Sequence, residues 1–169
     1  MEINAALNSS CRPFLIAGRS KRTKSIIRKI RRQDHAGMDL SRMDDVVGLR
    51  VVVKNNENVD CVCKTLAGRY PKLRVKDYRS DERRYRSTHI LLKHENPGEY
   101  TRSLEVQVRT LAQHLWAVES ESFGEKVKGG SSKSANINDY LVLLAKLCAL
   151  IDNGEIIEIY DMVPFSKKS

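Results

Sequence analysis

The chain has 169 residues, of which 41% are hydrophobic and 30% charged, and its formal net charge is +9. That length suits one domain with little room for a second, and the composition is ordinary for a globular protein. No apolar stretch approaches the length of a membrane span, and the N-terminal residues lack the sustained apolar run of a signal peptide. The positive charge predicts a polyanionic partner: nucleotide phosphates, nucleic acid or an anionic membrane surface.

Four cysteines, Cys11, Cys61, Cys63 and Cys148, lack the spacing of a zinc site. Two of them are separated by a single residue in a predicted helix, which is a poor geometry for a mutual disulfide. We therefore expect free thiols and a cytoplasmic location.

The first 33 residues divide into a weakly patterned part and a basic helix. Residues 1–18 show little periodicity, and Pro13 interrupts any long helix there. Residues 20–33 have helical spacing, with isoleucines on one side and cations on the other. Such a helix repels itself unless an anion lies against it, although a merely solvated basic helix is the alternative.

Strands and helices alternate along the rest of the chain. Residues 46–54 are nearly continuous valine and leucine, which predicts a strand buried on both faces. Further strands are expected at 73–78, 87–94 and 103–110, and helices at 56–69, 111–123 and 136–152. The order predicts an α/β (α+β) fold in which helices flank a mixed β-sheet, with the last helix docking on that sheet.

The stretch 103–110 alternates strictly between apolar and polar residues, as a half-buried strand does. Its apolar residues would face a core, and Glu105, Gln107 and Arg109 would form a row on the other face. A carboxylate, an amide and a guanidinium in a row suit a phosphate and its metal. A solvated outer face of a sheet is the alternative.

A second carboxylate, Asp45, precedes the valine-rich strand. If the two strands are neighbours, Asp45 and Glu105 could hold Mg²⁺ together with phosphate oxygens and waters. Cations that could stabilise transferring phosphoryl oxygens surround them in the sequence: Arg19, Lys21, Lys29, Arg50, Lys76, Arg79 and Arg109.

Tyr85, Ser87 and His89 share one phase of their predicted strand, so a ring, a hydroxyl and an imidazole would project together. The tyrosine ring could stack a nucleobase. Taken singly, Tyr85 also fits an ordinary strand tyrosine and His89 a structural histidine.

Several short motifs, in their order, resemble the synthetase domain of the RelA/SpoT family, whose members move pyrophosphate from ATP to the ribose 3′-hydroxyl of a guanine nucleotide. Residues 19–21 (RSK) with Lys29 resemble its R-x-K and following lysine, and residues 45–50 (DVVGLR) resemble its D-I-x-G-x-R. Residues 76–78 (KDY), 85–89 (YRSTH) and 105–110 (EVQVRT) resemble its K-D-Y, G-Y-x-S-x-H and E-V-Q-I-R-T.

The resemblance implies a nucleotidyltransferase-like core over residues 19–128, preceded by a segment 1–18 and followed by a helix and tail, 129–169, on the same domain. It implies ATP as donor, GDP or GTP as acceptor, AMP as leaving group, and Mg²⁺ on Asp45 and Glu105, with His89 as a further catalytic candidate. The ATP residues would be Arg19, Lys21, Ser25, Lys29 and Arg50, and the acceptor residues Lys76, Tyr85, Ser87, His89, Gln107 and Arg109.

The acceptor stays open, because Arg84 replaces the family's glycine and the loop from Lys76 to Tyr85 is short. A toxin branch of the family pyrophosphorylates the 3′ end of tRNA, and Lys126, Lys128 and Lys133 could contact such an RNA. A third interpretation, an inactive nucleotide- or RNA-binding module, is disfavoured by the retained carboxylates and cations. An antitoxin protein and a homo-oligomer are further candidate partners, and no membrane is expected.

Overall fold

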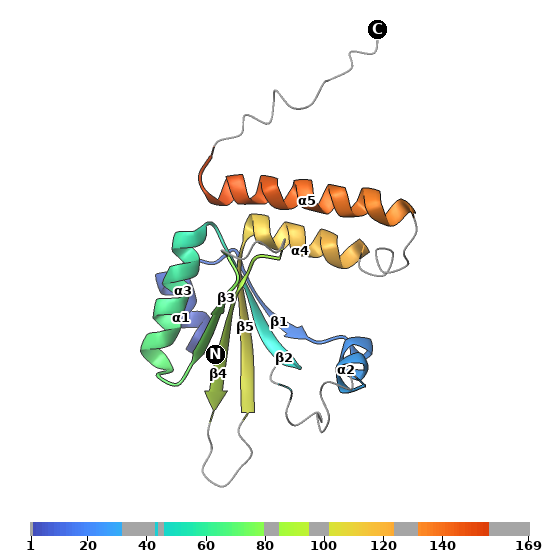
Figure 1. Ribbon diagram of the computed structural model, residues 1–169. Coiled ribbons are helices and arrows are strands. Elements are labelled where there is room, and N and C mark those ends of the chain that lie inside the picture. Colours follow the sequence, from blue (N-terminus) through green and yellow to red (C-terminus); the bar gives the residue numbers. More distant parts are fainter. Residues whose placement is uncertain are drawn as a thin grey trace. The chain divides into compact units, whose positions relative to one another are not determined.

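The computed structural model describes residues 2–31, 43, 46–79, 85–94, 102–123 and 132–155. The chain divides into two compact units, Met1–His114 and Leu115–Ser169. The first unit contains a β-sheet with its helices, and the second is helical (Figure 1). Within the described ranges, no helix is long and apolar enough to cross a membrane.

Five strands form one mixed sheet in the order β1-β2-β5-β4-β3. They are β1 (Leu15–Ser20), β2 (Val47–Val53), β3 (Arg74–Asp77), β4 (Thr88–His94) and β5 (Arg102–Thr110). The β2–β5 pair is parallel and the other three pairs are antiparallel. The predicted mixed sheet with flanking helices is confirmed, and β5 lies in its centre with a neighbour on either side.

The helices are α1 (Glu2–Ser10), α2 (Thr23–Ile30), α3 (Asn56–Arg69), α4 (Leu111–Phe123) and α5 (Ser132–Asp152). Helix α3 has the bounds predicted from its apolar spacing, and the Asn55 side chain caps it by accepting from the Asn58 amide. The weak patterning of residues 1–18 concealed both α1 and β1. The basic helix is shorter than predicted, because residues up to Ser20 belong to β1 and the described helix begins at Thr23.

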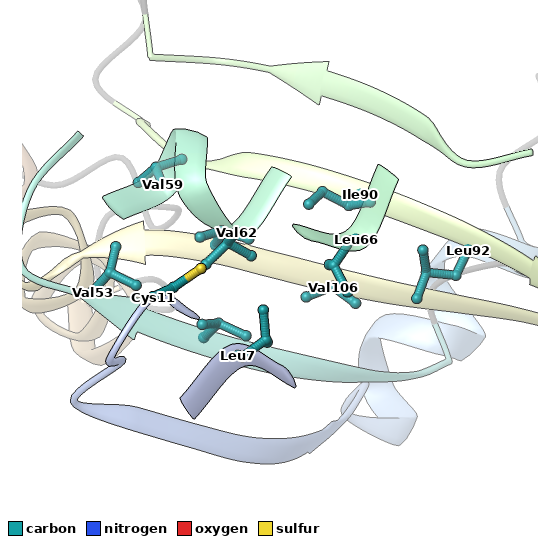
Figure 2. Packing of buried hydrophobic residues seen from close by; sticks show 11 residues of the cluster. Leu7, Cys11, Val53, Val59, Val62, Leu66, Ile90, Leu92 and Val106 are labelled. Atoms are coloured by element: carbon teal, nitrogen blue, oxygen red, sulfur yellow. The ribbon is translucent and has the colours of Figure 1, made fainter. Parts of the chain in front are cut away.

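One face of the sheet packs against α1 and α3 and forms the core (Figure 2). The cluster comprises Leu7, Cys11, Val51, Val53, Val59, Val62, Leu66, Ile90, Leu92, Val106 and Val108. Cα partners in a sheet point to the same face, and Val51 pairs with Val108. We call this the helix-covered face. Val51, Val52 and Val53 are all buried, so the end of β2 is covered on both faces as predicted, whereas Val47 is exposed.

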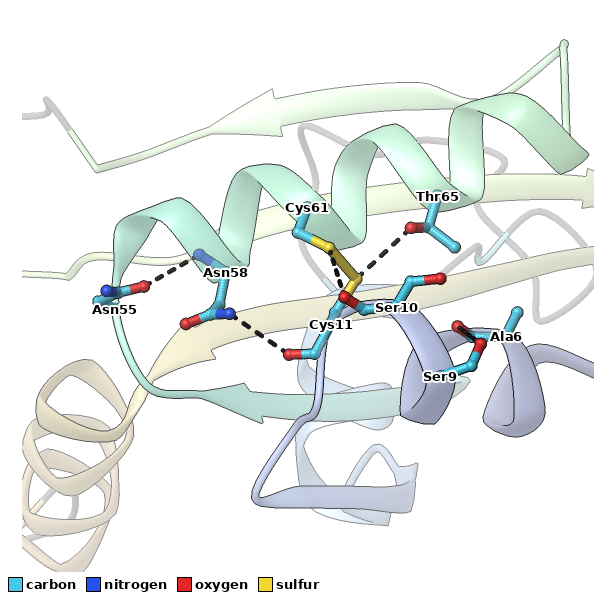
Figure 3. Close-up of a disulfide and its surroundings, with 8 residues drawn as sticks. All are labelled: Ala6, Ser9, Ser10, Cys11, Asn55, Asn58, Cys61 and Thr65. Atoms are coloured by element: carbon cyan, nitrogen blue, oxygen red, sulfur yellow. Dashed lines mark hydrogen bonds between the residues drawn. A yellow bond between two sulfur atoms is a disulfide. The ribbon is translucent and has the colours of Figure 1, made fainter.

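A disulfide joins Cys11 to Cys61 (Figure 3). The prediction of free thiols is therefore wrong for this pair, while Cys63 and Cys148 are not in a disulfide. Cys61 and Cys63 lie two residues apart on one helix and point in different directions, so spacing within that helix could not indicate a disulfide. Packing of α1 against α3 brings in Cys11 from 50 residues away, and its sulfur also lies 3.4 Å from the Thr65 hydroxyl.

Contacts between α4 and α5 stabilise the second unit. The Trp116 indole N–H donates to the Leu141 carbonyl at 2.9 Å, and the Phe123 and Tyr140 rings meet edge to face with centroids 6.0 Å apart. A buried indole needs a hydrogen-bond acceptor, and the backbone of α5 provides it.

Candidate active site

The alternation of β5 places Glu105, Gln107 and Arg109 on the sheet face opposite Val106 and Val108, which we call the polar face. Gln107 and Arg109 are only 4% and 2% exposed. The row is therefore largely covered, unlike the solvated outer face that the sequence left as an alternative. Buried polar groups of this kind need partners, and neighbouring strands provide most of them.

The Glu105 carboxylate accepts hydrogen bonds from side chains on three strands. Arg19 of β1 and Gln107 of β5 each donate to Oε2 at 2.9 Å, and His89 Nδ1 of β4 lies 2.9 Å from Oε1. Burial by itself raises the pKa of Glu105, but the hydrogen bond from His89 and the charges of His89 and Arg19 outweigh it. The net effect lowers the pKa of Glu105 below its ordinary value, so the carboxylate is ionised.

A chain of hydrogen bonds extends from Glu105 through His89 to Tyr85 and Arg109. Arg109 Nη2 donates to the Tyr85 hydroxyl oxygen at 2.8 Å and to Gln107 Oε1 at 3.2 Å. The Tyr85 hydroxyl oxygen also lies 2.8 Å from His89 Nε2, and either of these two atoms can be the donor. Because the ionised Glu105 carboxylate can only accept, His89 Nδ1 carries a proton that faces Glu105. We call these residues, with Arg19 and Gln107, the site network.

Arg109 retains donors that the site network does not use. Its Nε and Nη1 atoms are buried and make no hydrogen bond to the described part of the chain. Its guanidinium carbon lies 5.3 Å from the centroid of the Tyr85 ring, a cation–π arrangement. Buried N–H donors without an acceptor are costly, and an anionic ligand would supply one.

Tyr78 adds a third ring, which the sequence-based site did not include. Its ring centroid is 5.2 Å from that of His89 and 6.2 Å from that of Tyr85, both edge to face. The available signal was its place in the K-D-Y motif directly after β3.

Other predicted acceptor and ATP residues lie around the site network. Lys76 of β3 is the Cα partner of His89, and Arg50 of β2 is the Cα partner of Gln107, so both belong to the polar face. Ser87 is buried and its hydroxyl donates to the Val108 carbonyl at 3.1 Å. That hydroxyl therefore joins β4 to β5, which differs from the projection toward a ligand that we expected.

Lys21, Ser25 and Lys29 are in or next to α2, directly after β1. The Lys21 amide donates to the Val46 carbonyl at 2.9 Å, which anchors the approach to α2 beside the entry to β2. Asp45 lies outside the described residues, as do Lys126 and Lys128 and the side chain of Lys133. A metal shared by Asp45 and Glu105 thus stays a prediction. Among the residues the structure does describe, no three His, Cys, Asp or Glu side chains group as a metal site.

Arg79 was predicted to belong to the phosphate-binding cations, and the structure places it elsewhere. Its Nη2 lies 2.8 Å from Asp60 Oδ1 of α3 and 2.7 Å from Asp77 Oδ2. Two carboxylates already engage this guanidinium, so it is not a member of the polar-face site.

Fold and site together define an α/β protein with a carboxylate, cations and aromatic rings gathered on one face of a mixed sheet. The family model described as "Region found in RelA / SpoT proteins" matches residues 18–140. That is more than half of the chain, and the protein belongs to the RelA/SpoT family.

Similar proteins agree with this assignment. The GTP pyrophosphokinase YjbM of Bacillus subtilis is 29% identical over 121 residues, which are 68% of this chain and 57% of that protein, so the chain spans little more than half of its relative. Small alarmone synthetase 1 of B. subtilis, solved with its product pppGpp, superposes with a TM-score of 0.67 at 24% identity over 89% of this chain and 78% of that one. The Type VI effector Tas1, solved with its immunity protein, superposes with a TM-score of 0.50 at 16% identity over 87% of this chain and 89% of that one.

Proposed function

We propose that the protein is an ATP-dependent pyrophosphotransferase that moves the β,γ-pyrophosphate of ATP to the 3′-hydroxyl of GDP or GTP and releases AMP. The observation that carries the proposal is the site network around Glu105, built from residues of the family's own motifs. Family membership and the distant pyrophosphokinase relative support the same class of reaction.

The cations of the polar face suit the phosphates of the donor. Arg19 stands beside Glu105, and Lys21 and Lys29 follow it along the chain toward α2. Guanidinium and ammonium groups stabilise phosphoryl oxygens as charge shifts onto the leaving group. The two unused nitrogen donors of Arg109, Nε and Nη1, need an acceptor in the same region, and a phosphate oxygen provides a strong one.

A divalent metal fits this site in part. Glu105 offers the hard oxygen ligands that Mg²⁺ prefers. Arg19 and Gln107 both donate to Oε2 and only His89 to Oε1, so Oε1 keeps a lone pair for a metal. Asp45, the other proposed ligand, lies outside the described residues. Bound there, Mg²⁺ would offset negative charge on the ATP phosphates.

The acceptor is proposed to bind beside Tyr85. Its base would stack on an aromatic ring of this site, as bases commonly do on tyrosine. Its 3′-hydroxyl oxygen forms a bond to the β-phosphorus while the bond from that phosphorus to the oxygen bridging to the α-phosphate breaks. AMP departs with the bridging oxygen.

The proton of the 3′-hydroxyl needs an acceptor. Glu105 is a weak base here, because its pKa is lowered by its donors. His89 has its Nδ1 proton fixed by Glu105, which leaves Nε2 as the basic atom. We therefore assign proton removal to His89, oriented by Glu105, in preference to Glu105 itself.

The direct test is a transfer assay with ATP labelled at the γ-phosphate, Mg²⁺, and GDP, GTP or deacylated tRNA as acceptor. We expect label in the guanine nucleotide and an equal amount of AMP. The Glu105→Gln variant controls for a contaminating activity. Absence of transfer by folded protein to all three acceptors would overturn the proposal.

A tRNA acceptor is the second candidate, and the charge distribution favours it. The segment 12–31 contains no acidic residue and eight cations: Arg12, Arg19, Lys21, Arg22, Lys24, Arg28, Lys29 and Arg31. A free nucleotide needs few of these, whereas an RNA backbone can engage many. Label found only in tRNA would identify this reaction as the actual one, and an antitoxin partner would then gain support.

A further inference from the structure

A second charged cluster lies at the end of β3, on the helix-covered side of the sheet. Arg79 Nε lies 3.0 Å from each carboxylate oxygen of Asp77, and Arg79 Nη2 bridges Asp77 to Asp60 of α3. Asp77 Oδ1 also accepts from the Thr88 hydroxyl at 3.3 Å. Thr88 is buried and is the Cα partner of Asp77, which places the Asp77 side chain on the same face as the core. We call Arg79, Asp77 and Asp60 the Arg79 latch.

Tyr78 lies between two members of the Arg79 latch and points to the opposite side. Its ring meets His89 and Tyr85 on the polar face, and its amide donates to the Ser87 carbonyl at 3.0 Å. Successive side chains of an extended chain alternate between faces. Fixing Asp77 and Arg79 against α3 therefore fixes the direction of the Tyr78 ring.

We propose that Tyr78 is a third ring of the acceptor site and that Arg79, anchored by Asp60, is the positioning residue that holds it against His89 and Tyr85. This inference rests on the proposed function and names the part of the site that receives the nucleotide acceptor. Only residues 80–84 separate Arg79 from Tyr85 in the sequence. Holding Arg79 in place therefore also limits how far Tyr85 can lie from it.

Arg79 makes one local ion pair and one long-range ion pair, so its role in positioning Tyr78 can be tested apart from its effect on folding stability. The Arg79–Asp77 pair is local, within three residues, and involves no residue of α3. The Arg79–Asp60 pair connects the end of β3 to a helix of the core. A partly exposed ion pair contributes little to folding stability. Removing the Asp60 side chain should therefore leave the fold intact while releasing Arg79 from α3.

The test compares Asp60→Ala with Glu57→Ala, an exposed acidic residue of the same helix that serves as the matched control. Steady-state KM for the guanine nucleotide, KM for ATP, kcat and the melting temperature are measured for each. We expect Asp60→Ala and Arg79→Lys each to raise the acceptor KM about 3- to 10-fold and to leave the ATP KM unchanged. An effect of this size is typical of residues that act through a directly contacting neighbour. Glu57→Ala should match the wild type.

Tyr78 variants test the ring itself. Tyr78→Ala should raise the acceptor KM about tenfold or more, as the loss of an aromatic contact to a base does, and Tyr78→Phe should restore it because the contacts involve the ring edge. Exchange of the Tyr78 amide, which is bonded to Ser87, gives a readout independent of turnover and should accelerate in Asp60→Ala.

The outcomes separate the two proposals. Suppose that the wild type transfers pyrophosphate. If Asp60→Ala then behaves like Glu57→Ala, or if the KM values for ATP and acceptor rise together, the positioning role of the Arg79 latch is wrong and the proposed function stands. If the wild type transfers to no acceptor but calorimetry shows guanine nucleotide binding that weakens in Asp60→Ala, the latch stands alone. A wild type that neither transfers to nor binds an acceptor overturns both.

Discussion

Glu105 receives three donors from three different strands, so its negative charge holds the site network together. Glu105→Gln keeps the shape of the side chain but removes that charge, which leaves Arg19 without its ionic partner. We expect pyrophosphate transfer to fall by a factor of about 100 or more, because charge stabilisation in the active site is lost. The labelled-ATP assay measures this, with Glu57→Gln as control. A variant that keeps a tenth of wild-type activity would exclude an essential role for the carboxylate.

The Asp77 carboxyl offers a pH test of the Arg79 latch. The hydrogen bond from Arg79 lowers the pKa of Asp77 below its ordinary value of 3.8, although partial burial opposes it. A group whose pKa is lower in the folded state stabilises the protein above its unfolded pKa, and this contribution disappears as the pH falls through the folded pKa. The melting temperature of Asp77→Asn should therefore lie below that of the wild type by a constant amount above about pH 5. The difference should shrink below pH 4, and a difference that grew there would contradict this assignment of charge.

Pairing of β2 with β5 depends on Gly48, the Cα partner of Glu105. A Cβ at this position would clash with the backbone oxygen of Glu105, whereas a Cβ at Gly68 of α3 would meet nothing within 4 Å. We expect Gly48→Ala to destabilise the protein by about 2 kcal/mol or more, as forced backbone shifts in a core do. Gly68→Ala is the matched control and should stabilise the helix by up to about 1 kcal/mol. Urea unfolding measures both, and equal stability of the two variants would show that β2 and β5 are not this close.

The Cys11–Cys61 disulfide fastens α1 to α3 across a sequence separation of 50 residues. In the chain-entropy treatment, closing a loop of that size stabilises the folded state by about 4 kcal/mol. Cys11→Ser should therefore lower the free energy of unfolding by a similar amount, and dithiothreitol should destabilise the wild type but not the variant. Cys63→Ser, at a free thiol of the same helix, is the control. Insensitivity of the wild type to the reductant would indicate that these thiols are reduced in solution.

At the scale of the whole molecule, the positive charge gathers near the N-terminal end of the sequence. Lys24, Arg28 and Arg31 lie on one side of α2 and, with Ile27, line a hollow of about 410 Å³ that does not include Glu105. If tRNA is the acceptor, replacing these three cations with Gln should reduce the salt dependence of RNA binding, by about 2 to 3 in the slope of log K against log salt. Transfer to GDP should not change.

A triple variant at three other exposed cations removes the same charge elsewhere and serves as the control: Lys54, Lys64 and Arg69. Filter binding of tRNA over a range of salt concentrations measures the slopes. Equal slopes for both triple variants would show that only net charge matters and that α2 is not an RNA contact.

The sequence by itself determined the elements whose pattern is local. The period of two in residues 103–110 was sufficient to place Glu105, Gln107 and Arg109 on one face, because strand geometry fixes the direction of successive side chains. The apolar spacing of residues 56–69 gave the bounds of α3 for the same reason. The order of the motifs gave the family, and the alternation of strands and helices gave the mixed sheet.

Only the tertiary structure decided which distant residues meet. The register of β4 on β5 brings His89 to Glu105, and an ion pair with Asp60 of α3 holds Arg79 away from the polar face. Packing of α1 on α3 likewise brings Cys11 to Cys61. Periodicity describes what one segment does along its own axis and contains no information about its partners. Those contacts arise when separate segments bury apolar surface together, which depends on the whole chain.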